Sequence, residues 1–160
     1  MTNSSQYDQL DDLDRMILAE LCLDGRKSVT KLAEKLGIST TSCSVRVRRL
    51  VSERVIVGFR AVLDPKKMDQ CHVAFVEIKL EDTTEAALLA FDEAVGSVPE
   101  FEQCHLIAGS FDYLLKVRTK DIQAYRQVLV ESISELPHVA SVSTYLSMDT
   151  VKEIDLIPAL

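Results

Sequence analysis

Residues 28–53 of the chain are SVTKLAEKLGISTTSCSVRVRRLVSE, and this stretch decides the fold of the N-terminal part. Ser28 is a suitable N-cap for a helix, and apolar residues then recur at helical spacing. Gly37 permits the left-handed conformation that ends a helix, and Ser39 is placed to cap a second helix from Thr40 to Glu53. The stretch therefore predicts a helix-turn-helix.

The second of these helices separates an apolar face from a polar one. At about 100° per residue, the side chains within 80° of Cys43 make an inner face; they are Thr40, Val47, Leu50 and Val51. Short hydroxyl side chains on the opposite face allow close approach to base edges, and arginines reach guanine or phosphate. The candidate DNA contacts are the outward and flanking residues Thr41, Ser42, Ser44, Val45, Arg46, Arg48 and Arg49. An exposed helix end without a partner is the alternative interpretation.

The net charge of −7 is unevenly distributed along the chain. Residues 26–60 contain nine basic and two acidic side chains, a net charge of +7, whereas residues 66–160 contain eight basic and sixteen acidic ones, a net charge of −8. An acidic protein with one basic segment is typical of proteins that bind an anionic partner. Because charge clusters are also common on solvated helices, it is the helix-turn-helix pattern that favours double-stranded DNA.

A further helix and a connecting strand flank the helix-turn-helix. Apolar residues from Leu10 to Cys22 recur at helical spacing, and Asp24-Gly25 ends this helix. Residues 55–63 are rich in β-branched side chains and predict a wing-type hairpin or a linking strand, and Pro65 marks a domain boundary. The predicted organisation is a flexible N-terminal arm at 1–9, a helix-turn-helix domain at 10–55, a linking strand and linker at 56–70, and a second domain at 71–160.

The second domain contains a strand–helix–strand unit twice. The predicted order is strand 72–81, helix 84–95, strands 101–108 and 113–119, helix 121–136 and strand 139–148. This βαββαβ order predicts a ferredoxin-like domain with both helices on one sheet face, so the chain as a whole is α+β. Alternate apolar residues from Ala74 to Leu80 face the helices, and the other face begins with Val73 and Phe75. Because that face is partly apolar, we expect a second copy of the chain to cover it in a homodimer.

Several classes of protein are excluded or disfavoured. No run approaches the roughly 18 apolar residues of a membrane span, and the N-terminus lacks a secretory pattern, so we expect a cytoplasmic protein without membrane contact. The four cysteines have no metal-ligand spacing and the three histidines complete no zinc pattern, so we expect reduced thiols, no metal and no cofactor. No nucleophile, base and orienting group form a catalytic pattern, so we expect no enzyme.

The chain also resembles a known family over roughly residues 10–155. The matching segments are 13–18 (LDRMIL), 24–26 (DGR), 32–39 (LAEKLGIS), 43–50 (CSVRVRRL), 56–65 (IVGFRAVLDP), 102–115 (EQCHLIAGSFDYLL) and 144–148 (TYLSM). In order and spacing they resemble the leucine-responsive / asparagine-activated (Lrp/AsnC) regulators of bacteria and archaea. The resemblance implies dimers that build tetramers, octamers or higher assemblies, and small effectors, usually amino acids, bound in clefts between dimers. Two residues depart from the family pattern: Ser42 replaces a frequent proline, and Ser110 replaces a frequent acid.

The chemistry of residues 109–112 suits a free amino acid. Asp112 can pair with an ammonium group, while amides around Gly109 and Ser110 can donate to a carboxylate. The resemblance places the effector cleft near this loop and near alternate residues of the last strand. The candidate effector contacts are Leu106, Gly109, Ser110, Asp112, Thr144, Leu146 and Met148. A hairpin turn, where glycine and aspartate are common for local reasons, is the alternative.

These observations predict a sequence-specific DNA-binding transcriptional regulator whose assembly or DNA affinity is modulated by a small effector, an amino acid. An effector must favour one assembly over another, since equal affinity for both shifts nothing. A chromatin-organising DNA-binding protein that needs no effector is the alternative.

Overall fold

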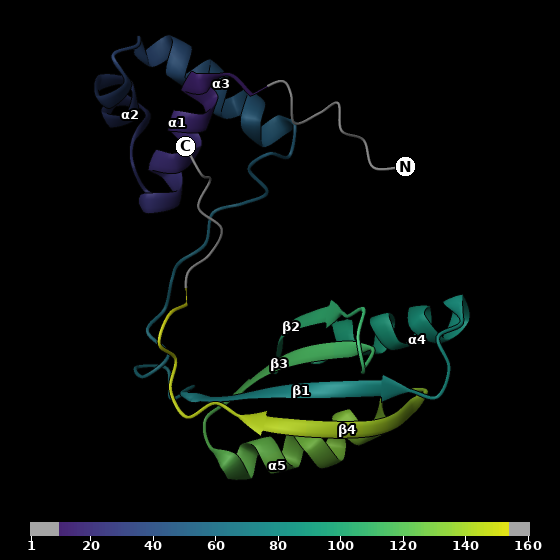
Figure 1. Cartoon of the computed structure of the whole chain (residues 1–160). Helices are drawn as coiled ribbons and strands as arrows, with labels where there is room; N and C mark the ends of the chain where they lie inside the picture. Colours follow the sequence, from purple (N-terminus) through teal and green to yellow (C-terminus); the bar gives the residue numbers. More distant parts are fainter. Residues whose placement is uncertain (1–9, 154–160) are drawn as a thin grey trace. The chain divides into compact units, whose positions relative to one another are not determined.

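The structure is a computed structural model that describes residues 10–153 (Figure 1). The chain divides into two compact units, one built around residues 10–62 and the other comprising residues 63–151. The division falls inside the segment 56–70 that the sequence assigns to a linker. The predicted flexible arm at 1–9 lies outside the described residues. Within the part that the structure describes, no helix is long and apolar enough to cross a membrane.

Three helices form the N-terminal unit: α1 (Asp12–Leu23), α2 (Val29–Leu36) and α3 (Thr40–Ser52). Their apolar faces meet in one core, whose buried members are Ile17, Leu32, Ala33, Cys43 and Leu50. Full burial of a leucine or isoleucine stabilises a fold by roughly 1.5–3 kcal/mol, so the burial of these side chains favours the packing of α3 against α1 and α2.

Hydrogen bonds at the helix ends confirm the predicted turn. Ser28 Oγ accepts a hydrogen bond from the Lys31 amide (3.3 Å), and Ser39 Oγ accepts one from the Ser42 amide (3.1 Å). Gly37 adopts a φ of 66°, in the left-handed region where a side chain would be strained. These local interactions end α2 and set the residue at which α3 begins.

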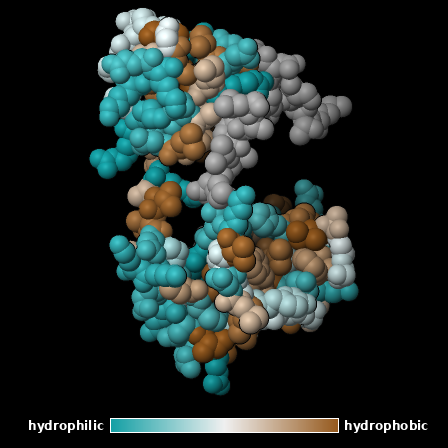
Figure 2. Space-filling model, turned by 60° about the vertical axis from the view of Figure 1, so that its left-hand side comes forward, coloured by the Kyte–Doolittle hydropathy of each residue, from teal (hydrophilic) through white to brown (hydrophobic). Residues whose placement is uncertain are grey.

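The predicted wing-type hairpin or linking strand at 55–63 is wrong, because none of these residues is in a strand. Val57 and Val62 are 90% and 87% exposed. A strand requires hydrogen bonds to a neighbouring strand, and a segment rich in β-branched residues does not form a strand unless such a neighbour is available. Figure 2 shows apolar side chains at the surface of the segment that joins the two units.

The C-terminal unit has the predicted ferredoxin-like order, and the α+β fold class is confirmed. Its elements are β1 (His72–Leu80), α4 (Glu85–Gly96), β2 (Phe101–Leu106), β3 (Tyr113–Thr119), α5 (Ile122–Glu131), the short 3-10 helix η2 (Ile133–Glu135) and β4 (Val139–Leu146). The strands lie in the order β2-β3-β1-β4 and every neighbouring pair is antiparallel. Both long helices cover the same face of the sheet, as Figure 1 shows.

The helix-covered face of the sheet holds the core of this unit. The alternate residues Ala74, Val76, Ile78 and Leu80 are buried there, as predicted. The predicted helix at 121–136 is wrong at its end, because α5 stops at Glu131 and η2 follows. The interruption lets Ile133 and Leu136 enter the core, so tertiary packing outweighs helix propensity here.

Candidate functional site

The outward face of α3 presents a stripe formed by Thr41, Val45 and Arg48, spaced four and then three residues apart. All three side chains are exposed, and Val45 is exposed to 59%. Arg48 forms no hydrogen bond or ion pair with any residue between 10 and 153. A helix surface with a free arginine and small neighbours can approach a DNA groove, where arginine reaches guanine or phosphate and apolar groups meet thymine methyls.

The inner face of α3 is narrower than the sequence predicts. Cys43 and Leu50 are fully buried and Val47 packs against the core. Thr40 is exposed, however, and Val51 is 44% exposed. Both lie at the edge of the apolar arc and at the two ends of the helix, where the other helices cover less of it.

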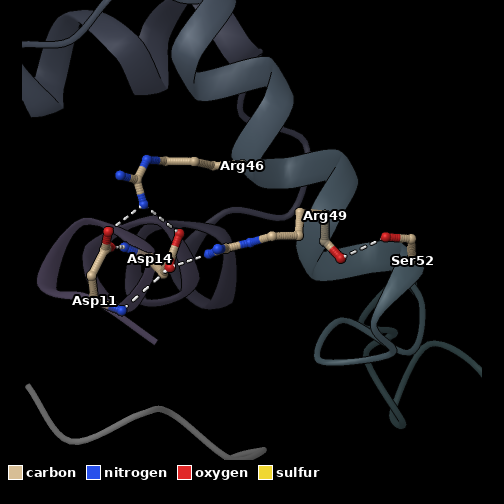
Figure 3. A network of polar contacts seen from close by, with 5 residues as sticks. All are labelled: Asp11, Asp14, Arg46, Arg49 and Ser52. Atoms are coloured by element: carbon tan, nitrogen blue, oxygen red, sulfur yellow. Dashed lines mark hydrogen bonds and ion pairs between the residues drawn. The ribbon is translucent and has the colours of Figure 1, made fainter. Parts of the chain in front are cut away.

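A second stripe on α3, formed by Ser42, Arg46 and Arg49, adjoins the beginning of α1 (Figure 3). Arg46 Nη1 donates to Asp11 Oδ2 (2.6 Å) and to Asp14 Oδ1 (2.9 Å). Arg49 Nη2 pairs with Asp14 Oδ2. Two of the three arginines that the sequence assigned to DNA are therefore engaged by carboxylates of the same unit, and Ser44 lies half-buried on the other flank.

Asp14 is the centre of this network and is completely buried. Its Oδ2 also accepts from the Asp11 amide (3.3 Å), while Asp11 Oδ1 accepts from the Asp14 amide (2.8 Å), which makes a capping box at the start of α1. The hydrogen bond from the Asp14 amide, followed by that from Arg46, lowers the pKa of Asp11. A buried carboxylate requires such pairing, since an unpaired one would be strongly destabilising.

Sequence reasoning missed the role of Asp14. Asp14 precedes Ile17 and Leu21 by three and seven residues, so it lies on the apolar face of α1. An aspartate on an apolar face needs a buried partner, and this is the signal that would have identified it. Its partners, Arg46 and Arg49, are 32 and 35 residues away and cannot be found from local spacing.

Ion pairs also reduce the basic surface of the N-terminal unit. Glu20 pairs with Lys27 and with Lys35 (2.6 Å), and the hydrogen bonds from these two lysines, Lys27 first, lower its pKa. Counted over residues 10–60, ten basic and seven acidic side chains leave a net charge of +3, against +7 for residues 26–60 alone. Some exposed basic side chains, among them Lys31 and Arg48, form no ion pair within residues 10–153. These side chains therefore dominate the electrostatic potential that a DNA duplex would meet.

The loop between β2 and β3 brings four candidate effector residues to one end of the sheet; they are Leu106, Gly109, Ser110 and Asp112. Asp112 Oδ2 accepts from the Leu80 amide (2.7 Å), two residues beyond Ile78, the last residue of β1 that pairs with β3. The Asp112 amide donates to the Ile78 carbonyl (2.9 Å). One carboxylate oxygen of Asp112 thus anchors the loop, and the other has no recorded partner in the described part of the chain.

Leu146 and Met148 lie toward the other end of the same sheet, and Thr144 lies opposite the middle of β1. Leu146 pairs with Ala74 and Thr144 pairs with Val76, whereas Asp112 binds the Leu80 amide. At about 3.3 Å per residue along β1, Leu146 is separated from the Asp112 contact at Leu80 by about 20 Å and Thr144 by about 13 Å. Within one chain the structure therefore does not bring Thr144, Leu146 and Met148 to the loop.

Thr144 also has a partner on the helix layer. Its Oγ1 lies 2.6 Å from Tyr125 Oη, whose ring belongs to α5. Leu146 and Met148 are exposed, and Met148 follows the end of β4. The end of β4 thus offers apolar side chains rather than charged ones.

Between residues 10 and 153, the two cysteines with shifted pKa values are not activated as nucleophiles. Burial raises the pKa of the Cys104 thiol to about 11, with the nearby Asp92 carboxylate acting in the same direction, so this thiol is protonated at neutral pH. Cys43 is buried and its pKa is also raised. Among the residues that the structure describes, no group of three or more His, Cys, Asp or Glu side chains could hold a metal ion.

Comparison with known proteins gives matches over both units. Residues 10–51 match the AsnC-type helix-turn-helix domain, and residues 73–157 match the Lrp/AsnC ligand binding domain. The chain is 54% identical to a proline dehydrogenase transcriptional activator of Rhizobium radiobacter, over 96% of this chain and 98% of that protein. It is 43% identical to the leucine-responsive regulatory protein of Escherichia coli K12, over 90% and 88%. The crystal structure of an AsnC family transcriptional regulator from Agrobacterium tumefaciens superposes with a TM-score of 0.88 at 34% identity, over 93% and 97% of the two chains.

Proposed function

The chain belongs to the Lrp/AsnC family and is a transcriptional regulator rather than an enzyme, and we propose that the outward stripe of α3 is its DNA-reading surface and that an amino acid is its effector. The helix-turn-helix domain binds DNA, and the C-terminal ligand-binding domain changes assembly or DNA affinity when it is occupied. We assign residues 10–55 to the first role, 71–160 to the second, and 56–70 to the link between them.

The DNA surface we propose consists of Thr41, Val45 and Arg48, with Ser42 and Ser44 on its flanks. The observation that carries this assignment is the free Arg48 in an exposed stripe of small and apolar side chains, on the helix that follows the tight turn. Such a helix enters the major groove with its first residues next to base edges. A homodimer would place two copies of this helix on two half-sites.

Selection from random duplexes, followed by fluorescence anisotropy, tests this surface. We expect an enriched sequence with two related half-sites, bound at least a thousandfold more tightly than unrelated duplex at the same salt concentration. Equal affinity for enriched and unrelated duplexes would show that α3 reads no sequence. That outcome would favour the chromatin-organising alternative.

For the effector, we propose that Asp112 pairs with the ammonium group of an amino acid. One oxygen of this carboxylate remains after the anchoring bond to Leu80, and a charged pair of this kind is a strong hydrogen bond. A Cβ at Gly109 would meet only Ile107 Cγ2, at 3.5 Å, which is an ordinary contact. The fold therefore does not require glycine there, and we infer that its small size leaves room for the ligand.

A complete effector site requires more than one copy of the chain. The loop group lies at one end of the sheet, Leu146 and Met148 lie toward the other end, and Thr144 contacts Tyr125 of the helix layer. We infer that a single cleft that contains all of them needs two protomers. Apolar side chains also remain exposed on the linking segment and at the sheet, including Val57, Val62 and Met148. We propose that homodimers cover them and assemble further to tetramers, octamers or higher forms.

Proline is the first effector that we would test, because a relative at 54% identity is named a proline dehydrogenase transcriptional activator. Leucine follows, from the name of the relative at 43% identity. A thermal-shift screen of proline with branched-chain, sulfur-containing and basic amino acids identifies binders, since a ligand of the native state raises its melting temperature.

Reciprocal titration separates the two functions. An effector that changes operator affinity by some factor must have its own affinity changed by the same factor when operator is bound. Calorimetry in the presence and absence of operator measures this directly. No heat and no change in assembly with any amino acid would support an effector-independent DNA-binding protein instead.

A further inference from the structure

The network between α1 and α3 divides the arginines of the DNA-binding helix into two kinds. Arg48 is exposed and without a recorded partner in the described chain. Arg46 and Arg49 are bound to the carboxylates of Asp11 and Asp14 (Figure 3). Arg46 and Arg49 lie on a helical stripe about 100° away from that of Arg48, so the two kinds of arginine point in different directions.

Asp14 holds both arginines from a buried position. Its side chain has no exposed surface, while those of Arg46 and Arg49 are 24% and 41% exposed. Each guanidinium reaches inward to a fixed carboxylate while part of its surface faces solvent. The contact joins the start of α1 to the middle of α3, so it constrains the rotation of α3 about its own axis.

The ion pair between Asp14 and Arg49 depends on charge more than on geometry. Arg49 pairs with Asp14 through Nη2, and its Nε is buried without a hydrogen-bond partner. A bidentate pair would be fixed by shape as well as by charge, whereas a single contact is not. A neutral side chain of the same shape at position 14 should therefore release this arginine.

A released guanidinium has an open route to solvent. Asp11, Ser42, Val45, Arg46 and Arg49 line an open hollow of about 390 Å³ between α1 and α3. Because Val45 belongs to the outward stripe, this hollow borders the surface that we assign to DNA. Free arginines there would be able to reach phosphates of a bound duplex.

We propose, on the basis of the DNA-binding function assigned above, that Asp14 is a positioning residue for DNA recognition. It holds Arg46 and Arg49 against α1, fixes the rotation of α3, and keeps these two guanidiniums out of the phosphate contacts. The stripe of Thr41, Val45 and Arg48 is thereby presented to the bases. Sequence specificity depends on Asp14 although its carboxylate does not touch DNA.

The salt dependence of DNA binding tests this proposal, because each phosphate contact contributes about 0.9 to the slope of log affinity against log salt. In Asp14→Asn, we expect the slope to steepen by about one to two as Arg46 and Arg49 reach phosphates. We expect the ratio of specific to non-specific affinity to fall at least tenfold. In the wild-type background, Arg49→Gln should leave the slope unchanged. Arg48→Gln should reduce the slope by about one if Arg48 contacts a phosphate, and should reduce discrimination at one base pair if it reads a base.

The double variant Asp14→Asn/Arg49→Gln identifies the arginine responsible. Its slope should be about one less steep than that of Asp14→Asn alone, because one of the two released guanidiniums is absent. Circular dichroism establishes that each variant is folded. Should Asp14→Asn not fold, Arg49→Gln in the wild-type background still tests the proposal, because the slope stays at the wild-type value if Asp14 keeps Arg49 off the phosphates and falls by about one if it does not.

Two results would overturn the positioning role while leaving the DNA-binding function intact. The first is a folded Asp14→Asn protein with the wild-type slope and the wild-type specificity ratio. The second is a slope reduced by about one in Arg49→Gln, which would make Arg49 a direct phosphate contact. Failure of the wild-type protein to bind any duplex would overturn both the DNA-binding function and this role.

Discussion

Replacing Arg48 by alanine isolates the contribution of the one α3 arginine that has no recorded partner in the described chain. Because no ion pair is lost, the free energy of unfolding should remain within about 0.5 kcal/mol of wild type, as for other exposed sites. DNA affinity should fall. If Arg48 neutralises one phosphate, the slope of log affinity against log salt loses about 0.9, which corresponds at 0.1 M salt to about an eightfold loss, or about 1.2 kcal/mol.

Fluorescence anisotropy with a selected duplex, measured from 50 to 200 mM salt, resolves this change. The ratio of wild-type to variant affinity should itself decrease about 3.5-fold over that range. If Arg48 reads a base instead, the slope stays constant and discrimination at one base pair falls by about 1–3 kcal/mol. Arg126→Ala, at an exposed position on α5, is the matched control for loss of a positive charge. An Arg48→Ala protein that matches this control in affinity, slope and discrimination would refute the assignment of α3.

Four further outcomes are expected. Asp112→Asn should fold normally, since an amide oxygen can still accept from the Leu80 amide. It should nevertheless lose the response to amino acids in calorimetry. Asp112→Ala should lose this response and also about 1 kcal/mol of stability in urea unfolding. Gly109→Ala should keep its melting temperature and weaken effector binding, and unaltered binding would show that the ligand lies elsewhere. The pKa of Glu20 in the folded protein is below its ordinary value of 4.5. The stability that ionised Glu20 contributes is therefore present above pH 4.5 and is lost as the pH falls through the folded pKa. In Glu20→Gln, the free energy of unfolding should consequently decrease less steeply as the pH is lowered. Val62→Asp should shift sedimentation toward smaller species without unfolding the chain, and an unchanged assembly would remove the linking segment from the interface.

Features that depend on a few neighbouring residues could be predicted from the sequence. The caps at Ser28 and Ser39 and the left-handed Gly37 follow from local hydrogen bonding and backbone sterics, and each is present in the structure. The alternation of residues from Ala74 to Leu80 likewise identified the buried side of β1, because strand periodicity is fixed at two residues.

Features that depend on partners distant in sequence were not accessible in this way. The buried Asp14 network joins residues more than thirty positions apart, and α5 ends early because Ile133 is needed in the core. The segment at 55–63 has the composition of a strand but no strand partner in the described chain. The candidate effector residues around Asp112 and Thr144 were grouped by resemblance, whereas the strand register separates them.

Site-specific photocrosslinking tests most directly whether the outward face of α3 lies on DNA. A benzoylphenylalanine is introduced at Val45 in one protein and at Leu89 on α4 in another, two positions with nearly equal exposure of 59% and 62%. With a selected duplex, position 45 should crosslink to the DNA within the half-sites, and position 89 should not. Equal yields at the two positions, or no crosslink from position 45 under conditions where the duplex is bound, would contradict the account.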